Sequence, residues 1–124
     1  MQIKESGENY LETILTLSNK LPVVRAVDIA TELNFKKSSV SVAMKNLREN
    51  GYISVSDAGY ITLNPSGLEI AEMIYERHAI LSKWLESLGV SKETAAEDAC
   101  RMEHVISKES FEAVKKHVLE YHMK

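Results

Sequence analysis

The chain has 124 residues, enough for one compact domain or for two small domains that share a core. Hydrophobic residues make up 44% of it and charged residues 27%, which is the balance of an ordinary globular protein and not of a disordered one. No apolar run approaches the ~20 residues of a membrane-spanning helix, and no secretory segment opens the chain, so a cytoplasmic protein with no membrane partner is expected. A single cysteine excludes an internal disulfide.

The first half of the chain predicts three short helices. Apolar residues recur at helical spacing in three segments, which are 5–19, 27–33 and 38–50. The hydroxyl group of Ser38 or Ser39 is expected to cap the third helix at its N-terminus. Gly51 follows this helix and is expected to close it in the left-handed conformation. A tight connection of four residues, 34–37, separates the second helix from the third.

A β-hairpin follows the third helix. Residues 52–55 and 60–63 predict two short strands, and residues 56–59 predict the loop that joins them. Short helices, a tight turn and a hairpin in this order are typical of a winged helix-turn-helix, here spanning residues 1–64. A small α+β domain with no nucleic-acid role is the alternative.

Residues 65–124 predict a second, purely helical domain. Asn64 and Pro65 suit the N-cap and first position of a long helix that extends to about Glu86. Ser91 and Ser107 are expected to cap two further helices. The predicted fold is therefore mainly α with a small β-hairpin: an N-terminal winged helix-turn-helix followed by an α-helical domain.

The distribution of charge indicates nucleic-acid binding, although the formal net charge is only −3. From residue 33 to residue 48 there are four bases and no acid, a local balance of +4. Small hydroxyl residues near a helix N-terminus also let a phosphate approach the backbone N–H groups. The candidate DNA-binding residues are Lys36, Lys37, Ser38, Ser39, Ser41, Lys45 and Arg48. No Arg, Asn or Gln occupies positions 38–44, so serine hydroxyls, water and the methyl groups of Val40 and Val42 are left to read bases.

The segment Cys100–His104 places a thiol, a carboxylate and an imidazole within five residues. In a helix, Cys100, Glu103 and His104 share one face. This mixed set of donors suits a late first-row divalent metal better than calcium or magnesium. His78 on the preceding long helix is a fourth candidate ligand. Two more, Asn9 and Glu12, lie three residues apart on the first helix.

The segment 98–107 resembles the signature of the diphtheria-toxin-repressor (DtxR/MntR) family of metal-dependent repressors. Three other segments agree with it, namely 8–14, 63–67 and 77–78. Members of this family are homodimers in which a winged helix reads a double-stranded DNA operator and a helical domain dimerises. The resemblance implies that residues 65–124 dimerise and that Fe²⁺ or Mn²⁺ binds between the two domains. The ligands it implies are Asn9, Glu12, His78, Cys100, Glu103 and His104.

The ligand positions mix the two branches of that family. Its manganese branch usually has aspartate and glutamate where this chain has Asn9 and Cys100. Its iron branch has cysteine at the Cys100 position, but its second metal site uses residues that Ser82 and Ala96 replace here. A thiolate is softer than a carboxylate, so Fe²⁺ is favoured and Mn²⁺ is the alternative. The chain is expected to be a short form without the SH3-like third domain of longer members.

The sequence therefore predicts a non-enzymatic, metal-dependent repressor that controls iron or manganese homeostasis. Two other regulators stay open: a winged-helix protein that senses a small organic ligand, and one that senses redox state through Cys100. A small metalloenzyme that uses the Cys/Glu/His set is a further alternative, but no general base or substrate pocket is evident beside these residues.

Overall fold

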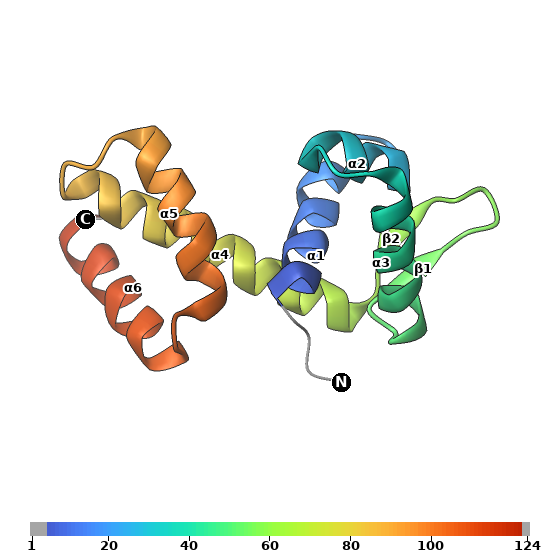
Figure 1. Cartoon of the computed structure of the whole chain (residues 1–124). Coiled ribbons are helices and arrows are strands. Elements are labelled where there is room, and N and C mark those ends of the chain that lie inside the picture. Colours follow the sequence, from blue (N-terminus) through green and yellow to red (C-terminus); the bar gives the residue numbers. More distant parts are fainter. Residues whose placement is uncertain (1–4, 123–124) are drawn as a thin grey trace. The chain divides into compact units, whose positions relative to one another are not determined.

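The computed structural model describes residues 5–122 of the chain (Figure 1). Within them the chain forms six helices and one two-stranded antiparallel sheet, so the predicted fold class is confirmed. It divides into two compact units, Met1–Glu72 and Met73–Lys124, and the division falls inside the long helix α4 (Pro65–Ser87). None of the described helices is both long enough and apolar enough to cross a membrane.

The first unit is a helix-turn-helix with a hairpin. Its elements, before α4, are α1 (Glu5–Ser18), α2 (Ala26–Leu33), α3 (Lys37–Glu49), β1 (Ile53–Val55) and β2 (Ile61–Leu63). The core forms where one face of each helix meets the inner face of the hairpin. Leu11 and Ile14 of α1 and Ile29 of α2 are completely buried in it. Burial of an aliphatic side chain of this size contributes about 1.5–3 kcal/mol, so these contacts hold the three helices together.

Helix α3 is anchored to this core by one face. Val40, Met44 and Leu47 follow at i, i+4 and i+7, and all three are buried. Because successive residues on a helix are rotated by about 100°, the opposite face of α3 points to solvent.

The prediction that Ser38 or Ser39 caps α3 is wrong. The N-cap is Lys36, which has extended backbone angles, and no side chain caps the helix. The start is set by the preceding turn, where Asn34 takes the left-handed conformation (φ 57°) and Phe35 N–H bonds to Ala30 O at 3.0 Å. This turn ends early enough for the helix to begin at Lys37, so both serines lie in its first turn, exposed to solvent.

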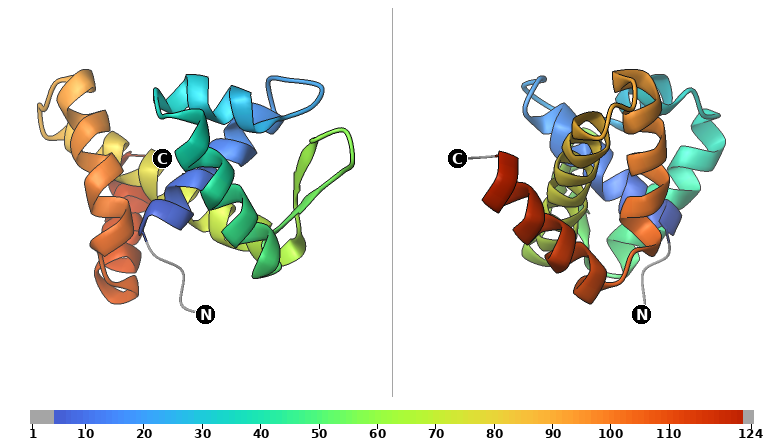
Figure 2. Two further views of the ribbon diagram at one scale, coloured as in Figure 1. Left: turned by 45° about the vertical axis from the view of Figure 1, so that its right-hand side comes forward. Right: turned by 90° about the vertical axis from the view of Figure 1, so that its left-hand side faces the viewer.

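The hairpin extends from the unit as a narrow loop (Figure 2). Ile53 pairs with Leu63 and Val55 pairs with Ile61 across the two strands. The loop is closed by a bond from Ser56 N–H to Tyr60 O at 2.9 Å. Ile61 N–H also bonds to Val24 O at 2.7 Å, which joins the hairpin to the segment that precedes α2.

Polar bonds and a close approach fix the start of α4 to the hairpin. Asn64 precedes the helix as predicted, but its side chain turns away to accept a bond from Ser54 Oγ (2.7 Å) and to donate one to Gly51 O (3.0 Å). Gly67 lies against the carbonyl group of Tyr52, where a Cβ atom would collide with the oxygen. This position of α4 therefore requires a residue without a side chain.

In the second unit the remainder of α4 packs with α5 (Lys92–Val105) and α6 (Lys108–His122), as Figure 2 shows. Leu81, Ala99 and Phe111, one from each helix, are buried against each other. The predicted caps are confirmed: Ser91 Oγ accepts from Thr94 N–H at 3.3 Å and Ser107 Oγ accepts from Ser110 N–H at 3.1 Å.

Candidate metal centre and nucleic-acid interface

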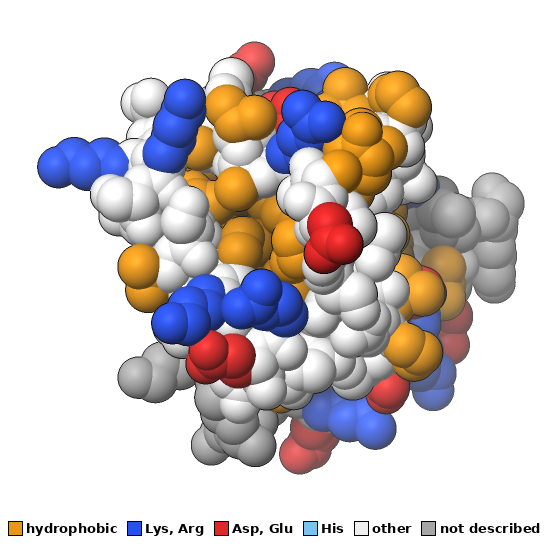
Figure 3. Space-filling view, turned by 90° about the vertical axis from the view of Figure 1, so that its right-hand side faces the viewer, with side chains coloured by type: hydrophobic (Ala, Val, Ile, Leu, Met, Phe, Trp, Pro, Cys, Tyr) orange, Lys and Arg blue, Asp and Glu red, His pale blue; other side chains and the backbone are white. Residues whose placement is uncertain are grey.

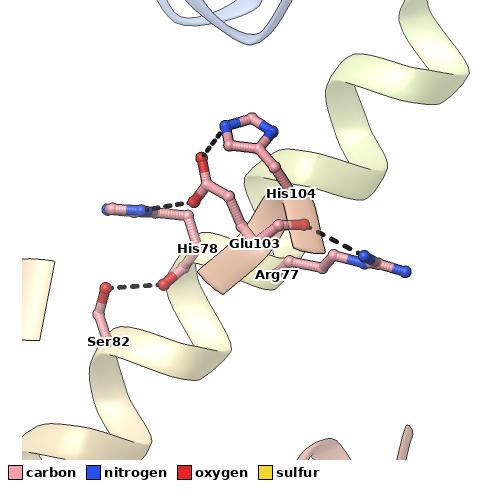
Figure 4. Close-up of polar contacts among 5 residues, drawn as sticks. All are labelled: Arg77, His78, Ser82, Glu103 and His104. Atoms are coloured by element: carbon pink, nitrogen blue, oxygen red, sulfur yellow. Dashed lines mark hydrogen bonds and ion pairs between the residues drawn. The ribbon is translucent and has the colours of Figure 1, made fainter. Parts of the chain in front are cut away.

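A buried carboxylate between two imidazoles is the central feature of the second unit (Figure 4). Glu103 of α5 is completely buried. His78 of α4 lies beside it, and its Nδ1 donates a hydrogen bond to Glu103 Oε2 at 2.8 Å. On the other side, His104 Nε2 lies 3.3 Å from Glu103 Oε1. Two of the six predicted ligands, His78 and His104, therefore each contact a third, Glu103.

One oxygen of this carboxylate is incompletely satisfied. The contact from His104 lacks the alignment of a hydrogen bond, so Glu103 Oε1 is buried with no hydrogen-bond partner among the described residues. A buried charge is costly unless it is paired and hydrogen-bonded. A cation would supply what this oxygen lacks, and the oxygen and imidazole nitrogens around it suit a first-row divalent metal. The residues present therefore fit the predicted metal.

Arg77 holds the C-terminal end of α5 in place. Its Nη1 donates to two backbone oxygens, Glu103 O at 3.1 Å and Ile106 O at 3.0 Å. The last carbonyl groups of a helix have no partner within the helix, and the guanidinium group satisfies them. It also lies 5.4 Å from the centre of the Phe111 ring. This role of Arg77 was not predicted from the sequence, where the residue contributed only to the family resemblance.

The other predicted ligands are less enclosed. Cys100 lies one turn before Glu103 on α5 and is exposed. Asn9 and Glu12 are half-buried on α1, which belongs to the first unit. Over residues 5–122, no three or more His, Cys, Asp or Glu side chains are already grouped as a metal would require. Glu103 is instead engaged by the histidines that flank it.

The candidate DNA-binding residues all lie on the exposed surface of the first unit. Lys36 precedes α3, and the others lie along that helix with their side chains in solvent. One prediction is wrong: Val40 is completely buried, so its methyl groups cannot read a base. Val42, by contrast, is 61% exposed.

An apolar hollow separates α3 from the hairpin, and basic side chains lie at its edge (Figure 3). Its volume is about 260 Å³, and its lining includes Met44, Val55 and Ile61. Lys45 and Arg48 of α3 contribute to the same lining, which contains no acidic residue. Neither side chain has a hydrogen-bond or ion-pair partner among the described residues, so both are available to a phosphate.

Arg25, at the start of α2, was not predicted to have a role. It donates from Nη2 to the Tyr60 hydroxyl at 3.2 Å, and its guanidinium lies 4.8 Å from the centre of that ring. This pair fixes the hairpin against α2. A basic residue and an aromatic one separated by 35 positions carry no local signal by which sequence reasoning could pair them.

Both parts of the chain match known family models. Residues 2–61 match the iron dependent repressor N-terminal DNA binding domain, and residues 64–122 match the iron dependent repressor metal binding and dimerisation domain. The chain belongs to the iron-dependent repressor family. It is accordingly a metal-dependent, DNA-binding transcriptional regulator with a DNA-binding domain followed by a metal-binding and dimerisation domain, as predicted.

Relatives of known sequence align with most of this chain. An uncharacterised HTH-type transcriptional regulator of Methanocaldococcus jannaschii is 35% identical over 115 residues, which are 91% of this chain and 92% of the relative. The transcriptional regulator MntR of Salmonella typhimurium is 34% identical over 110 residues, 89% of this chain and 70% of its own.

Solved structures share the fold. A manganese-dependent transcriptional repressor in complex with manganese has a TM-score of 0.83 and 24% identity, over 90% of this chain and 52% of the other. IdeR of T. acidophilum has a TM-score of 0.77 and 24% identity, over 94% of this chain and 55% of its own. This repressor therefore spans about half the length of these two proteins.

Proposed function

We propose that this chain is a metal-gated repressor whose operator-binding form is stabilised by Fe²⁺, with Mn²⁺ as the alternative, and that it controls the homeostasis of that metal. The observation that carries the proposal is the buried carboxylate of Glu103. One of its oxygens has no hydrogen-bond partner within residues 5–122, and the carboxylate lies between His78 and His104 in the part of the chain that matches a metal-binding domain.

The proposed donors come from both units. His78, Glu103 and His104 supply nitrogen and oxygen, and Cys100 supplies a thiolate from the same helix as Glu103. Asn9 and Glu12 supply oxygen from α1. A bound divalent cation provides the positive charge that all these donors share. Because some donors belong to the DNA-binding unit and others to the helical unit, a complete donor set requires one arrangement of the two.

This requirement supplies the switch. In a homodimer the two copies of α3 must enter successive major grooves, roughly 34 Å apart. Donor residues of both units that share one cation favour a single arrangement of the units. They therefore raise the population of the form in which the two copies of α3 have this spacing. Without a cation to share, the carboxylates of Glu12 and Glu103 repel each other.

The identity of the metal rests on Cys100. A thiolate is a softer donor than a carboxylate and favours Fe²⁺ over Mn²⁺. One of the solved relatives is described in complex with manganese, so Mn²⁺ is the second candidate. Both ions accept the nitrogen and oxygen donors of the remaining residues.

The proposed contacts to DNA are made by Lys36, Lys37, Ser38, Ser39, Ser41, Lys45 and Arg48. Lys45 and Arg48 lie beside the apolar hollow and have no partner in the described part of the chain, which suits them to successive phosphates of one strand. Lys36, Lys37 and the serines surround the N-terminus of α3, where backbone N–H groups also favour an anion.

The test is operator binding under anaerobic conditions. A duplex is first selected from a random pool with the full chain and Fe²⁺, and its affinity is then measured by gel shift with Fe²⁺, with Mn²⁺ and with chelator. The proposal expects tight binding only with metal, and weaker discrimination in Glu103→Gln. Equal affinity in chelator and in metal would overturn it.

A further inference from the structure

One apolar side chain interrupts the polar, outward face of α3. Val42 is 61% exposed, whereas the other valine of the helix, Val40, is completely buried. Val is a poorer helix former than Ala, Lys or Gln, so its presence on an exposed helical face adds nothing to the stability of the helix. Exposed single valines are common in proteins, so exposure alone indicates no function for Val42, and its position on the helix is what matters.

The position of Val42 is fixed by the core. Val40 and Met44 are both buried, and Val42 lies two residues from each, about 200° around the helix. The methyl groups of Val42 therefore point away from the body of the unit, and α3 cannot rotate without exposing Val40. The residues one turn away on the same side are small or polar: Ser38, Ser39, Lys45 and Asn46.

The chemistry of the major groove restricts what such a side chain can recognise. Base edges there offer hydrogen-bond donors, acceptors and one apolar group, the 5-methyl of thymine. A valine cannot bond to the polar groups, and placing it over them would leave them desolvated without a partner. The small serines one turn earlier let this part of the helix approach the bases closely.

We infer that Val42 is a specificity-determining residue that packs against the 5-methyl group of a thymine in each operator half-site. The inference rests on the proposed function, since it needs α3 to lie in the major groove. It assigns sequence reading to Val42, while Lys45 and Arg48, which line the hollow, hold the DNA backbone.

The experiment removes only the methyl group. In the duplex selected with the full chain and metal, each thymine is replaced by uracil in both half-sites, one symmetric pair at a time. Affinities are measured for the natural chain, for Val42→Ala and for Val27→Ala. The last is a matched control, because Val27 is 43% exposed on the neighbouring helix α2.

The expected result is one sensitive thymine position. Loss of its methyl weakens binding roughly fourfold per half-site, the factor that corresponds to ~0.8 kcal/mol for one buried carbon group, and roughly sixteenfold for both half-sites together. Val42→Ala makes this position insensitive, and Val27→Ala leaves the sensitivity intact.

Three outcomes would overturn the inference. In the first, replacing thymine by uracil has no effect at any position. In the second, Val42→Ala keeps the full sensitivity to uracil, which would assign that sensitivity to DNA shape or to another residue. In the third, no duplex is bound at all, and the proposed function falls as well. Equal binding with and without metal would contradict only the proposal that metal controls operator binding, because the uracil comparison still decides the role of Val42.

Discussion

Glu103 and His78 join α5 to α4 through a 2.8 Å hydrogen bond that satisfies one oxygen of a completely buried carboxylate and leaves the other without a hydrogen-bond partner among the described residues. Removing a carboxylate from water is unfavourable, and a single well-formed bond offsets only part of that cost. A neutral group at this position would stabilise the fold as well as the carboxylate of Glu103 does. A cation needs the charge, so stability and metal binding place opposite demands on this position.

Glu103→Gln is expected to separate these demands. Glutamine has nearly the same shape and still accepts a bond from His78, so the free energy of unfolding without metal stays the same or rises. For the natural chain, Mn²⁺ at one hundred times its dissociation constant adds about 2.7 kcal/mol of stability. The variant is expected to gain little at the same concentration. Thermal unfolding with and without Mn²⁺ measures both effects.

The matched control is Glu97→Gln, which removes the same charge from an exposed position of the same helix. It is expected to keep the full metal-dependent gain. Equal gains in both variants and in the natural chain would show that Glu103 does not bind the metal.

Cys100 is expected to set the preference among metals. Cys100→Glu replaces a soft donor by a hard one, so the ratio of Fe²⁺ to Mn²⁺ affinity falls. Cys100→Ser removes the thiolate without adding a charge and weakens binding of both ions. Competition between the two ions under anaerobic conditions measures the ratio. An unchanged ratio in Cys100→Glu would mean that the thiol lies outside the metal's donor set.

Local signals account for most of what the sequence predicted. Ser91 and Ser107 cap α5 and α6, and Gly51, with φ 82°, follows α3 as expected. Each of these depends on a few neighbouring residues, and capping is a short-range interaction. The start of α3 was missed because Asn34 rather than a serine sets it: a left-handed turn three residues upstream decides where the helix begins.

The candidate site was predictable as a set of residues but not as an arrangement. Helical spacing places Cys100, Glu103 and His104 on one face, yet it gives no indication that Glu103 is the member that enters the core while Cys100 is exposed. The partners that decide this lie far away in sequence. Arg77 reaches the backbone oxygens of residues 26 and 29 positions further along the chain, and no periodicity encodes such a contact.

Arg77→Met is expected to loosen the end of α5. The variant keeps most of the apolar length of the side chain but leaves the carbonyl groups of Glu103 and Ile106 without their donor, at a cost of about 1–3 kcal/mol. Metal affinity is expected to fall as well, because the backbone that carries Glu103 and His104 is less constrained. Urea unfolding and metal titration measure the two losses. Arg101→Met, at an exposed position of α5, should change stability by no more than about 0.5 kcal/mol.

Gly67→Ala is expected to destabilise the first unit. Helix propensity alone favours alanine by about 0.8–1.0 kcal/mol. The added Cβ would, however, collide with the carbonyl oxygen of Tyr52, and forced overpacking of this kind costs about 1–3 kcal/mol. The midpoint of urea unfolding should therefore fall. A rise in the midpoint would mean that α4 and the hairpin can move apart at no cost, contrary to the close approach at Gly67.

The salt dependence of operator binding distinguishes phosphate contacts from base contacts at the edge of the hollow. If Lys45 and Arg48 each neutralise one phosphate per subunit, Lys45→Gln and Arg48→Gln each reduce the slope of log affinity against log salt concentration by about 1.8 for a dimer. Affinity should fall by a similar factor for operator and unrelated duplexes, because phosphates carry no sequence. Lys92→Gln, an exposed position at the start of α5 in the second unit, should leave the slope unchanged. A variant that loses affinity for the operator alone, with the slope intact, would instead assign that side chain to a base edge.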